Sequence, residues 1–362
     1  MTAVETPPVF ATLSELAGSE ATGTLLRGLG LGGFVPESGV SYLGRNQNCA
    51  GRTTAGAEVF VKKIDGAAVQ FERAVRFEEM NRERGGGGVR APSLLGHDER
   101  NGLLVFERVL GHRSGAELAT DDRITASDCA RMGALLGRLH GFPAADPTRF
   151  GAAQSVLPEE PALRRLSAAQ FVELSAAELE LWNLIQYDRV LLAAVDRLRE
   201  HERAAVHRPI HADLRLDQYL IDGASVYLTD WEEFRLGDPA RDVGGFVGEW
   251  LYRAVLGIAG NGDDDLSGHE GVLRRGVAEI AGIRPLVSSF WRGYREAADF
   301  ADAGLAARAV GYAGWHTFER LFASARFGPR LSATQRAVVG VGRTALVRPE
   351  KFFTALGLED HR

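Results

Sequence analysis

Scarcity of cysteine is the first constraint that the sequence sets. Its two cysteines, Cys49 and Cys129, cannot build a disulfide framework or a multi-cysteine metal cluster, and this scarcity is typical of a reducing compartment. The first residues lack the basic and apolar segments of a secretory signal peptide. Apolar runs, such as residues 190–195, fall far short of the roughly 20 residues that cross a bilayer. We therefore expect a cytoplasmic protein with no membrane partner.

A strong excess of charge is also missing. The 362 residues carry a formal net charge of −6, and 45% of them are hydrophobic and 25% charged. This balance is typical of an ordinary globular protein and gives no support to a nucleic-acid partner. The pattern G-x-x-x-x-G-K-[ST] is absent from the sequence, which argues against a P-loop enzyme. The length allows two lobes or one large domain.

What the sequence does contain is a β-rich first third followed by a helical remainder. β-Branched and aromatic residues predict strands at 40–43 and 58–64 and a hairpin at 93–106. Apolar spacing predicts a helix at 70–82, and helical periodicity dominates from Ser127 onward. The later helices are expected at 181–198, 243–260, 285–300 and 303–325.

The most informative segment runs from His211 to Glu232. Asp213 lies in a polar loop between apolar segments, and Asp230 follows 17 residues later at the end of a short predicted strand. Phosphoryl transfer needs one carboxylate that orients and deprotonates the attacking hydroxyl, and another that holds Mg²⁺ on the nucleotide phosphates. The loop resembles H-x-D-x-x-x-x-N, with Gln218 in the place of Asn. The segment therefore predicts a kinase with Asp213 as its catalytic base and Asp230 as its Mg²⁺ ligand.

The order of the motifs resembles that of the aminoglycoside phosphotransferase and choline kinase superfamily. This resemblance implies an α+β, bilobal, protein-kinase-like fold with ATP and Mg²⁺ as cofactors. A small β-rich N-lobe is expected at 1–110 and a larger helical C-lobe at 111–362, with a hinge at 111–114. The pieces that carry the resemblance are the loop at 44–51, the strand ending at Lys62, residues 104–108, the R-L-H helix at 136–140, the Asp213 loop, the D-W-E segment at 230–232, and the G-D-P-x-x-D segment at 237–242.

The resemblance also implies a lysine that binds the α- and β-phosphates of ATP. Lys62 follows three apolar strand residues and takes this role, while the next side chain points to the other face of the strand. Its partner should be a glutamate on the following helix. Glu78 fits the usual spacing best, ahead of Glu72 and Glu79.

Four further residues are assigned to nucleotide binding by the resemblance. Gly44 and Asn46 lie in the loop that would cover the phosphates, where backbone N–H groups and polar amides can contact them. Glu107 and Val109 lie in the expected connection between the lobes.

The other residues of the Asp213 loop admit more than one interpretation. His211 organises the loop by hydrogen bonding rather than by titrating in the reaction. Arg215 binds a phosphate or a peptide carboxylate, or it forms a structural ion pair with a nearby Asp. Gln218 ligates a second metal through its amide, leaves a single well-held metal, or marks an inactive site. Asp217 is a further candidate carboxylate.

A narrower resemblance is to the kinase subunit of class V lanthipeptide synthetases. It is carried by residues 214–218, by 229–234, and by 44–48 before the V-F-V-K-K strand. It implies phosphorylation of Ser or Thr in a ribosomally made precursor peptide. It also implies a partner lyase that eliminates the phosphate to leave a dehydroamino acid.

Two alternatives stand beside the peptide kinase. One is a kinase of a small molecule such as an aminoglycoside, a macrolide or a choline-like alcohol, and the other is a pseudokinase that binds a leader peptide and scaffolds the lyase. An arginine-rich C-terminal region with fewer acids favours a peptide or anionic partner over a polycation. These arginines are Arg292, Arg295, Arg308, Arg320, Arg326, Arg330 and Arg336.

Overall fold

A computed structural model gives the architecture of the chain as two compact units. The first unit comprises Met1–Arg113 and Leu220–Phe234, and the second comprises Ser114–Tyr219 and Arg235–Arg362. The first boundary therefore falls three residues after the one expected from the sequence. The structure describes residues 10–11, 15–42, 46–64, 68–142, 150, 155, 157–158, 160–260 and 269–359.

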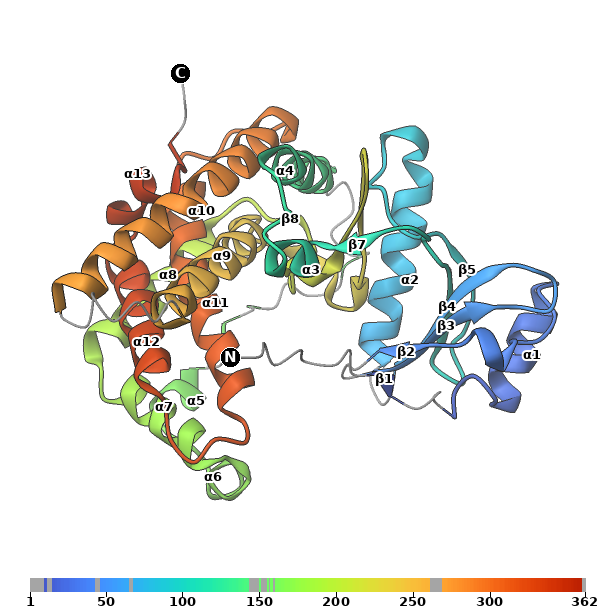
Figure 1. Ribbon diagram of the computed structural model, residues 1–362, viewed down its shortest axis with the longest axis horizontal. Helices are drawn as coiled ribbons and strands as arrows, with labels where there is room; N and C mark the ends of the chain where they lie inside the picture. Colours follow the sequence, from blue (N-terminus) through green and yellow to red (C-terminus); the bar gives the residue numbers. More distant parts are fainter. Residues whose placement is uncertain are drawn as a thin grey trace. The chain divides into compact units, whose positions relative to one another are not determined.

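A four-stranded antiparallel sheet is the centre of the first unit (Figure 1). Its strands follow the order β3–β4–β6–β5, so that β4 pairs with β3 on one side and β6 on the other. The predicted strand at 58–64 and hairpin at 93–106 are confirmed. The bounds are β3 Gln47–Arg52, β4 Glu58–Lys63, β5 Leu94–Asp98 and β6 Leu103–Glu107.

One part of the expected phosphate-covering loop is strand instead. Residues 47–51, predicted as part of a loop at 44–51, belong to β3. Cys49 and Ala50 are buried there, and they pair with Val61 and Phe60 of β4. The small and polar residues of this segment have low β-propensity, so the sequence did not predict a strand here. Pairing with β4 and burial hold the segment in the sheet.

Each face of this sheet is covered by one helix. Val59 and Val61 share a buried cluster with Leu26 of α1, whereas Leu104 packs with Phe71 of α2. Side chains alternate along a strand, so Lys62 of β4 points to the α2 side. The helices are α1 Glu20–Gly28 and α2 Ala68–Glu83, and the shorter strands are β1 Phe10–Ala11, β2 Ser41–Tyr42, β7 Arg113–Ser114, β9 Tyr219–Asp222 and β10 Ser225–Leu228.

The segment that carries Asp230 belongs to the first unit, although the sequence placed it in the helical lobe. The ring of Trp231 stacks on Phe77 of α2, with 3.4 Å between the centroids and 6° between the planes. Phe234 meets the same Phe77 ring edge-on. This aromatic cluster attaches the segment to α2, and it explains why Trp231 is buried in the core.

Helices make up most of the second unit, and several helix pairs approach closely at glycines. A Cβ on Gly133 of α4 would lie 2.0 Å from the carbonyl oxygen of Phe290 of α10, so only glycine fits there. A Cβ on Gly244 of α9 would lie 2.4 Å from the Cβ of Tyr312 of α11. The bounds are α3 Gly115–Thr120, α4 Ala126–His140, α5 Glu160–Arg164, α6 Ala168–Glu173, α7 Ala176–Gln186, α8 Arg189–Ala204, α9 Ala240–Gly260, α10 His269–Ala297, α11 Leu305–Ala325, α12 Ala333–Val347 and α13 Phe353–Leu356, with strands β8 Arg208–Ile210 and β11 Arg235–Gly237.

One predicted helix is two helices in the structure. The segment 181–198 divides into the end of α7 and the start of α8. Asp188 causes the break, because its Oδ1 accepts hydrogen bonds from the backbone N–H groups of Val190 and Leu191 and caps α8. The helices predicted at 243–260 and 303–325 are present as α9 and α11. The helix predicted at 285–300 is the second half of α10, which begins earlier, at His269, and continues through Pro285. Within the described residues, none of the helices is both long and apolar enough to cross a bilayer.

Candidate active site

Asp213 lies on a loop whose backbone is held in an unusual conformation. The loop follows β8, and Ala212 adopts a left-handed conformation with φ of 69°. The N–H groups of His211 and Ala212 both donate to the carboxylate of Asp242, at 2.6 and 2.8 Å. A non-glycine residue tolerates this backbone only where its surroundings over-determine it. The two hydrogen bonds to Asp242 provide that constraint directly before Asp213.

Asp242 is a fully buried anion at the start of α9. Its Oδ2 also contacts Nε2 of His140 at 3.1 Å, and Nδ1 of His140 contacts the hydroxyl of Tyr294 at 2.9 Å. Burial alone would raise the pKa of Asp242, but the hydrogen bond and charge of His140 and the proximity of His211 hold it below its usual value. The R-L-H motif and the final Asp of G-D-P-x-x-D thus act together, by anchoring the Asp213 loop.

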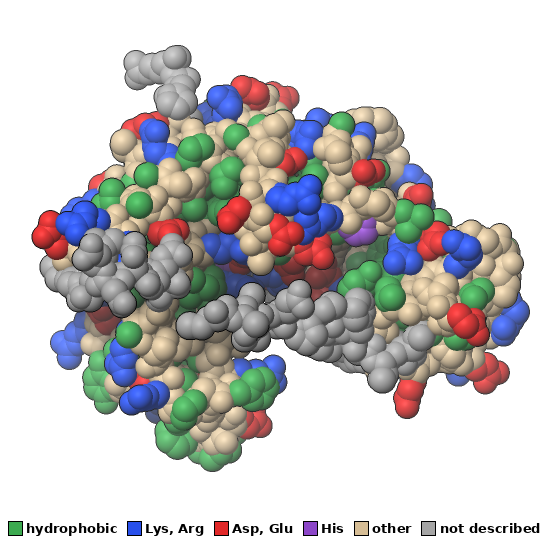
Figure 2. All heavy atoms as spheres, viewed as in Figure 1, with side chains coloured by type: hydrophobic (Ala, Val, Ile, Leu, Met, Phe, Trp, Pro, Cys, Tyr) green, Lys and Arg blue, Asp and Glu red, His purple; other side chains and the backbone are tan. Residues whose placement is uncertain are grey.

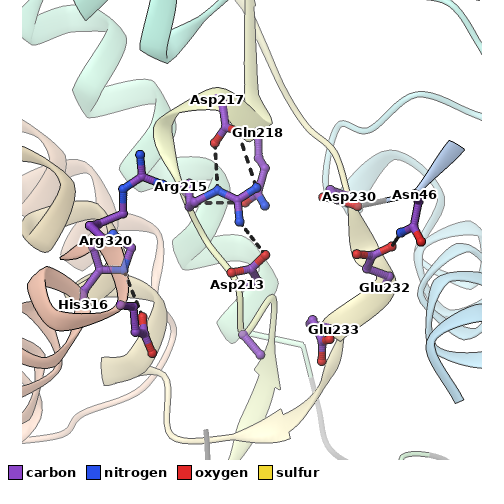
Figure 3. A network of polar contacts seen from close by, with 12 residues as sticks. Asn46, Asp213, Arg215, Asp217, Gln218, Asp230, Glu232, Glu233, His316 and Arg320 are labelled. Atoms are coloured by element: carbon purple, nitrogen blue, oxygen red, sulfur yellow. Dashed lines mark hydrogen bonds and ion pairs between the residues drawn. The ribbon is translucent and has the colours of Figure 1, made fainter. Parts of the chain in front are cut away.

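Arg215 connects two carboxylates of the loop (Figure 3). Its Nη1 donates to Oδ2 of Asp213 at 2.7 Å, and its Nε donates to Oδ1 of Asp217 at 3.1 Å. The side chains of Arg215 and Asp213 are 27% and 36% exposed, so both are within reach of an acceptor molecule. The structural ion pair expected as one alternative for Arg215 is therefore present, and it involves the proposed base itself.

Gln218 is buried and takes part in the folding of its own loop. Its Oε1 accepts a hydrogen bond from the backbone N–H of Arg215 at 2.9 Å. That oxygen is the atom expected to bind a second metal. Metal binding by Gln218 would therefore require this hydrogen bond to be shared or broken, and the metal role stays a prediction.

The ammonium group of Lys62 lies against two carboxylates of the first unit. It forms an ion pair with Asp230, and its Nζ lies 2.9 Å from Oε2 of Glu232. Burial alone would lower the pKa of Lys62, but the charges and hydrogen bonds of Asp230 and Glu232 raise it above its ordinary value. Asp230 itself has a left-handed backbone, with φ of 70°. The structure thus brings together Lys62 and Asp230, two residues that the sequence assigned to nucleotide and metal.

Glu78 is not the partner of Lys62, and this expectation is corrected. Glu78 is 7% exposed, and its Oε1 has no hydrogen-bond partner among the described residues. Burial raises the pKa of this carboxyl, against smaller opposing effects of the Leu94 backbone and Arg82. Spacing along a helix cannot tell which nearby acid reaches the lysine, and here Asp230 and Glu232 do so.

Comparison with known proteins identifies the family. The model of the phosphotransferase enzyme family (APH) matches residues 44–269, which is more than half of the chain. The chain belongs to this family. The enzyme class predicted from the sequence, a phosphotransferase with an alcohol group as acceptor, is thereby confirmed.

Solved structures support the fold of this phosphotransferase. An amicoumacin kinase in complex with AMP-PNP, Ca²⁺ and Ami is 17% identical, covers 87% of this chain and 90% of its own, and has a TM-score of 0.51. The α+β, protein-kinase-like fold class is therefore confirmed. A macrolide 2′-phosphotransferase from Brachybacterium faecium is 13% identical, with coverage of 91% and 99% and a TM-score of 0.49. A choline/ethanolamine kinase family protein from Mesorhizobium loti is 17% identical, with coverage of 88% and 92% and a TM-score of 0.48. A search of the curated proteins gave no match.

The remaining predicted nucleotide contacts of the phosphotransferase lie at different places in the first unit. Gly44 lies outside the described residues. Asn46 is 9% exposed, and its Nδ2 donates to Oε2 of Glu232 at 2.6 Å. Glu107 ends β6 and is exposed, and Val109 follows it half-buried. Contacts of these residues with a nucleotide stay predictions.

The carboxylates of the first unit suit Mg²⁺ chemically. Mg²⁺ prefers hard oxygen ligands and is commonly bound by one or two carboxylates together with nucleotide phosphates. Asp230 offers such oxygens, with Glu232 two residues away. Within the described part of the chain, there is no group of three or more His, Cys, Asp or Glu side chains suited to a metal. A metal shared with nucleotide phosphates therefore fits this site better than one held by protein ligands alone.

Sequence reasoning missed the roles of two acids next to Asp230. Glu232 contacts Lys62 and Asn46, and Glu233 binds Arg73 at 2.9 Å. The available signal was the three acids among residues 230–233, two of which lie in a short 3-10 helix and meet different partners. Only the fold shows which partner each acid meets.

Proposed function

We propose that this chain is an ATP- and Mg²⁺-dependent kinase that phosphorylates a hydroxyl group of a small-molecule alcohol. The observation that carries the proposal is Asp213, a part-exposed carboxylate on a loop anchored by the buried Asp242. In this proposal Asp213 orients the acceptor hydroxyl and takes its proton, and Lys62 binds the nucleotide phosphates. Bound Mg²⁺ would neutralise charge on those phosphates, with Asp230 as its protein ligand.

Relatives of known structure support a small-molecule acceptor. The similar structures include an amicoumacin kinase and a macrolide 2′-phosphotransferase, which supports a small molecule with a hydroxyl group. Arg215 lies beside Asp213, but it is paired with both Asp213 and Asp217, so these three side chains carry no net positive charge and do not by themselves select the charge of the acceptor.

The second candidate is a Ser or Thr hydroxyl of a precursor peptide, with a phosphate-eliminating lyase as partner. The resemblance at residues 214–218 and 229–234 to class V lanthipeptide kinases motivates it. The arginine-rich C-terminal region supports it less than its composition suggests. Three of its arginines are paired with acids: Arg308 with Asp238, Arg320 with Glu249, and Arg336 with Glu180.

Acidic and basic side chains are accordingly interspersed over the helical unit on the face drawn in Figure 2. A mixed surface of this kind does not form a basic tract for an acidic leader peptide. For either acceptor we propose that the enzyme acts in the cytoplasm, where ATP is supplied.

One experiment separates the two acceptors. The purified chain would be incubated with Mg²⁺ and γ-labelled ATP, together with either a panel of hydroxylated small molecules or Ser- and Thr-containing precursor peptides. Label in a small molecule supports the first candidate. A phosphopeptide that loses phosphate when a phosphate-eliminating lyase is added supports the second. Label that persists with Asp213→Asn would exclude Asp213 as the base, and no transfer to any acceptor would contradict the proposed kinase.

A further inference from the structure

One carboxylate oxygen of the first unit accepts from two donors that both lie far from it in the sequence. Oε2 of Glu232 lies 2.9 Å from Nζ of Lys62 and 2.6 Å from Nδ2 of Asn46. Glu232 is 5% exposed, and the Lys62 side chain is 15% exposed. Charge-assisted hydrogen bonds between groups that are shielded from water are among the stronger polar contacts in proteins. The cluster therefore fixes the position of the Lys62 ammonium relative to the start of β3.

The helix that precedes the β5–β6 hairpin is held without help from Lys62. Arg73 and Gln70 of α2 donate to the two oxygens of Glu233, at 2.9 and 2.8 Å, and Phe77 stacks on Trp231. Glu78 of the same helix stays buried with its Oε1 unpartnered among the described residues. A lysine–glutamate pair is thus not needed to place α2, and no acid of α2 is needed to hold Lys62.

Asn46 is itself tied to the neighbouring strand. The side chain of Asn48 donates to the carbonyl oxygens of Tyr42 and Asn46, at 3.0 and 3.2 Å, and accepts from the N–H of Tyr42 at 2.8 Å. These bonds link the end of β2 to the start of β3. Glu232 therefore holds Lys62 and, through Asn46, the residues that flank the expected phosphate-covering loop.

We propose that Glu232, rather than a glutamate of α2, is the positioning residue of this kinase. It holds the Lys62 ammonium for the nucleotide phosphates and couples Lys62 to Asn46. The proposal rests on the proposed function for its account of nucleotide binding. If Asp230 held a metal ion, Lys62 would still have Glu232 as a carboxylate partner to keep its ammonium group in place.

The first test measures nucleotide affinity by titration calorimetry on the full chain with Mg²⁺ and AMP-PNP. Glu232→Gln should weaken binding about 10- to 100-fold, because it replaces a charged partner of Lys62 with a neutral one. The matched control Glu78→Gln removes another buried carboxyl and should change binding by less than about threefold. In the combined variant, Asn46→Ala should add little to Glu232→Gln, because both interrupt one cluster. A larger loss with Glu78→Gln, or independent effects of Asn46 and Glu232, would overturn the proposal.

The second test needs neither nucleotide nor activity. Acetylation of Lys62 by a water-soluble reagent would be followed by peptide mass spectrometry on the folded protein. Glu232→Gln should speed labelling of Lys62 several-fold, and Glu78→Gln should leave it unchanged. Equal labelling in all three proteins would refute the positioning role. A wild-type chain that binds no nucleotide but shows the expected labelling pattern would refute the proposed function and leave the role of Glu232 standing.

Discussion

The anchor of the Asp213 loop allows a quantitative prediction. Asp242→Ala removes the acceptor of three buried donors: the N–H groups of His211 and Ala212, and Nε2 of His140. Leaving one buried donor unsatisfied costs about 1–3 kcal/mol, and Ala212 also loses the bond that holds its left-handed backbone. With partial relaxation, we expect the free energy of unfolding to fall by about 3–6 kcal/mol. Asp242→Asn keeps one acceptor oxygen, so it should lower the free energy of unfolding by about half as much as Asp242→Ala does.

Urea unfolding followed by tryptophan fluorescence suits this prediction. Four of the five tryptophans, Trp182, Trp250, Trp291 and Trp315, lie in the second unit, so the signal reports mainly on the unit that contains Asp242. The control is Asp217→Asn on the same loop, whose side chain is 54% exposed and which should shift stability by less than about 0.5 kcal/mol. A loss below about 1 kcal/mol for Asp242→Ala, or an equal loss for both sites, would show that the anchor is not needed.

Four further predictions concern the reaction and the pH dependence of stability. Asp213→Asn should keep MgATP affinity and lower turnover by roughly two to four orders of magnitude; near wild-type phosphate transfer would exclude it as the base. Gln218→Ala should raise the Mg²⁺ concentration needed for activity if the amide binds metal, and Gln218→Asn should be better tolerated; an unchanged Mg²⁺ requirement would leave the amide only its structural hydrogen bond. Burial alone would raise the pKa of Glu319, but Arg241 and His316 lower it to about 2. The contribution of the Glu319 carboxylate to the free energy of unfolding should therefore be lost as pH falls from about 4.5 towards 2. Glu319→Gln should flatten this part of a profile of stability against pH. Burial alone would lower the pKa of His316, but Glu249 and Glu319 raise it. The contribution of protonated His316 to the free energy of unfolding is therefore fully present below the ordinary pKa of histidine and is lost as pH rises through the raised value. A free energy of unfolding that instead falls on acidification through neutral pH would contradict this prediction.

The sequence predicted the elements that local patterns determine. The strand ending near Lys62 and the 93–106 hairpin follow from β-branched and aromatic residues with turn signals between them. Asp213 and Asp230 could be singled out because their spacing and neighbours match a reaction with known chemical needs. The break at Asp188 was missed because the apolar spacing continues through it, although an Asp before a helix is a recognised capping signal.

Contacts over long sequence distances could not be read from the chain. Glu78 was chosen as the partner of Lys62 from the spacing within one helix. The carboxylates that Lys62 actually meets, Asp230 and Glu232, lie more than 160 residues after the lysine. The use of the Gln218 oxygen within its own loop also depends on the backbone path, which the residue type does not reveal. The charge that a surface offers to an acceptor depends on which of its side chains are already paired. Composition counts Arg308 and Arg336 as free cations, but both form ion pairs with acids.

The close helix crossings of the second unit have a practical consequence for stabilising the enzyme. Replacing an exposed helical glycine with alanine normally gains about 0.5–1 kcal/mol, because alanine has the higher helix propensity. A Cβ would meet nothing within 4 Å at Gly282 of α10 or Gly340 of α12, so alanine there should raise the melting temperature. The same exchange at Gly133 or Gly293 would drive a methyl group to within 2.0 or 2.1 Å of a carbonyl oxygen on the opposing helix. Thermostabilised versions of this kinase can therefore be sought by filling the first two positions while keeping the other two as glycine.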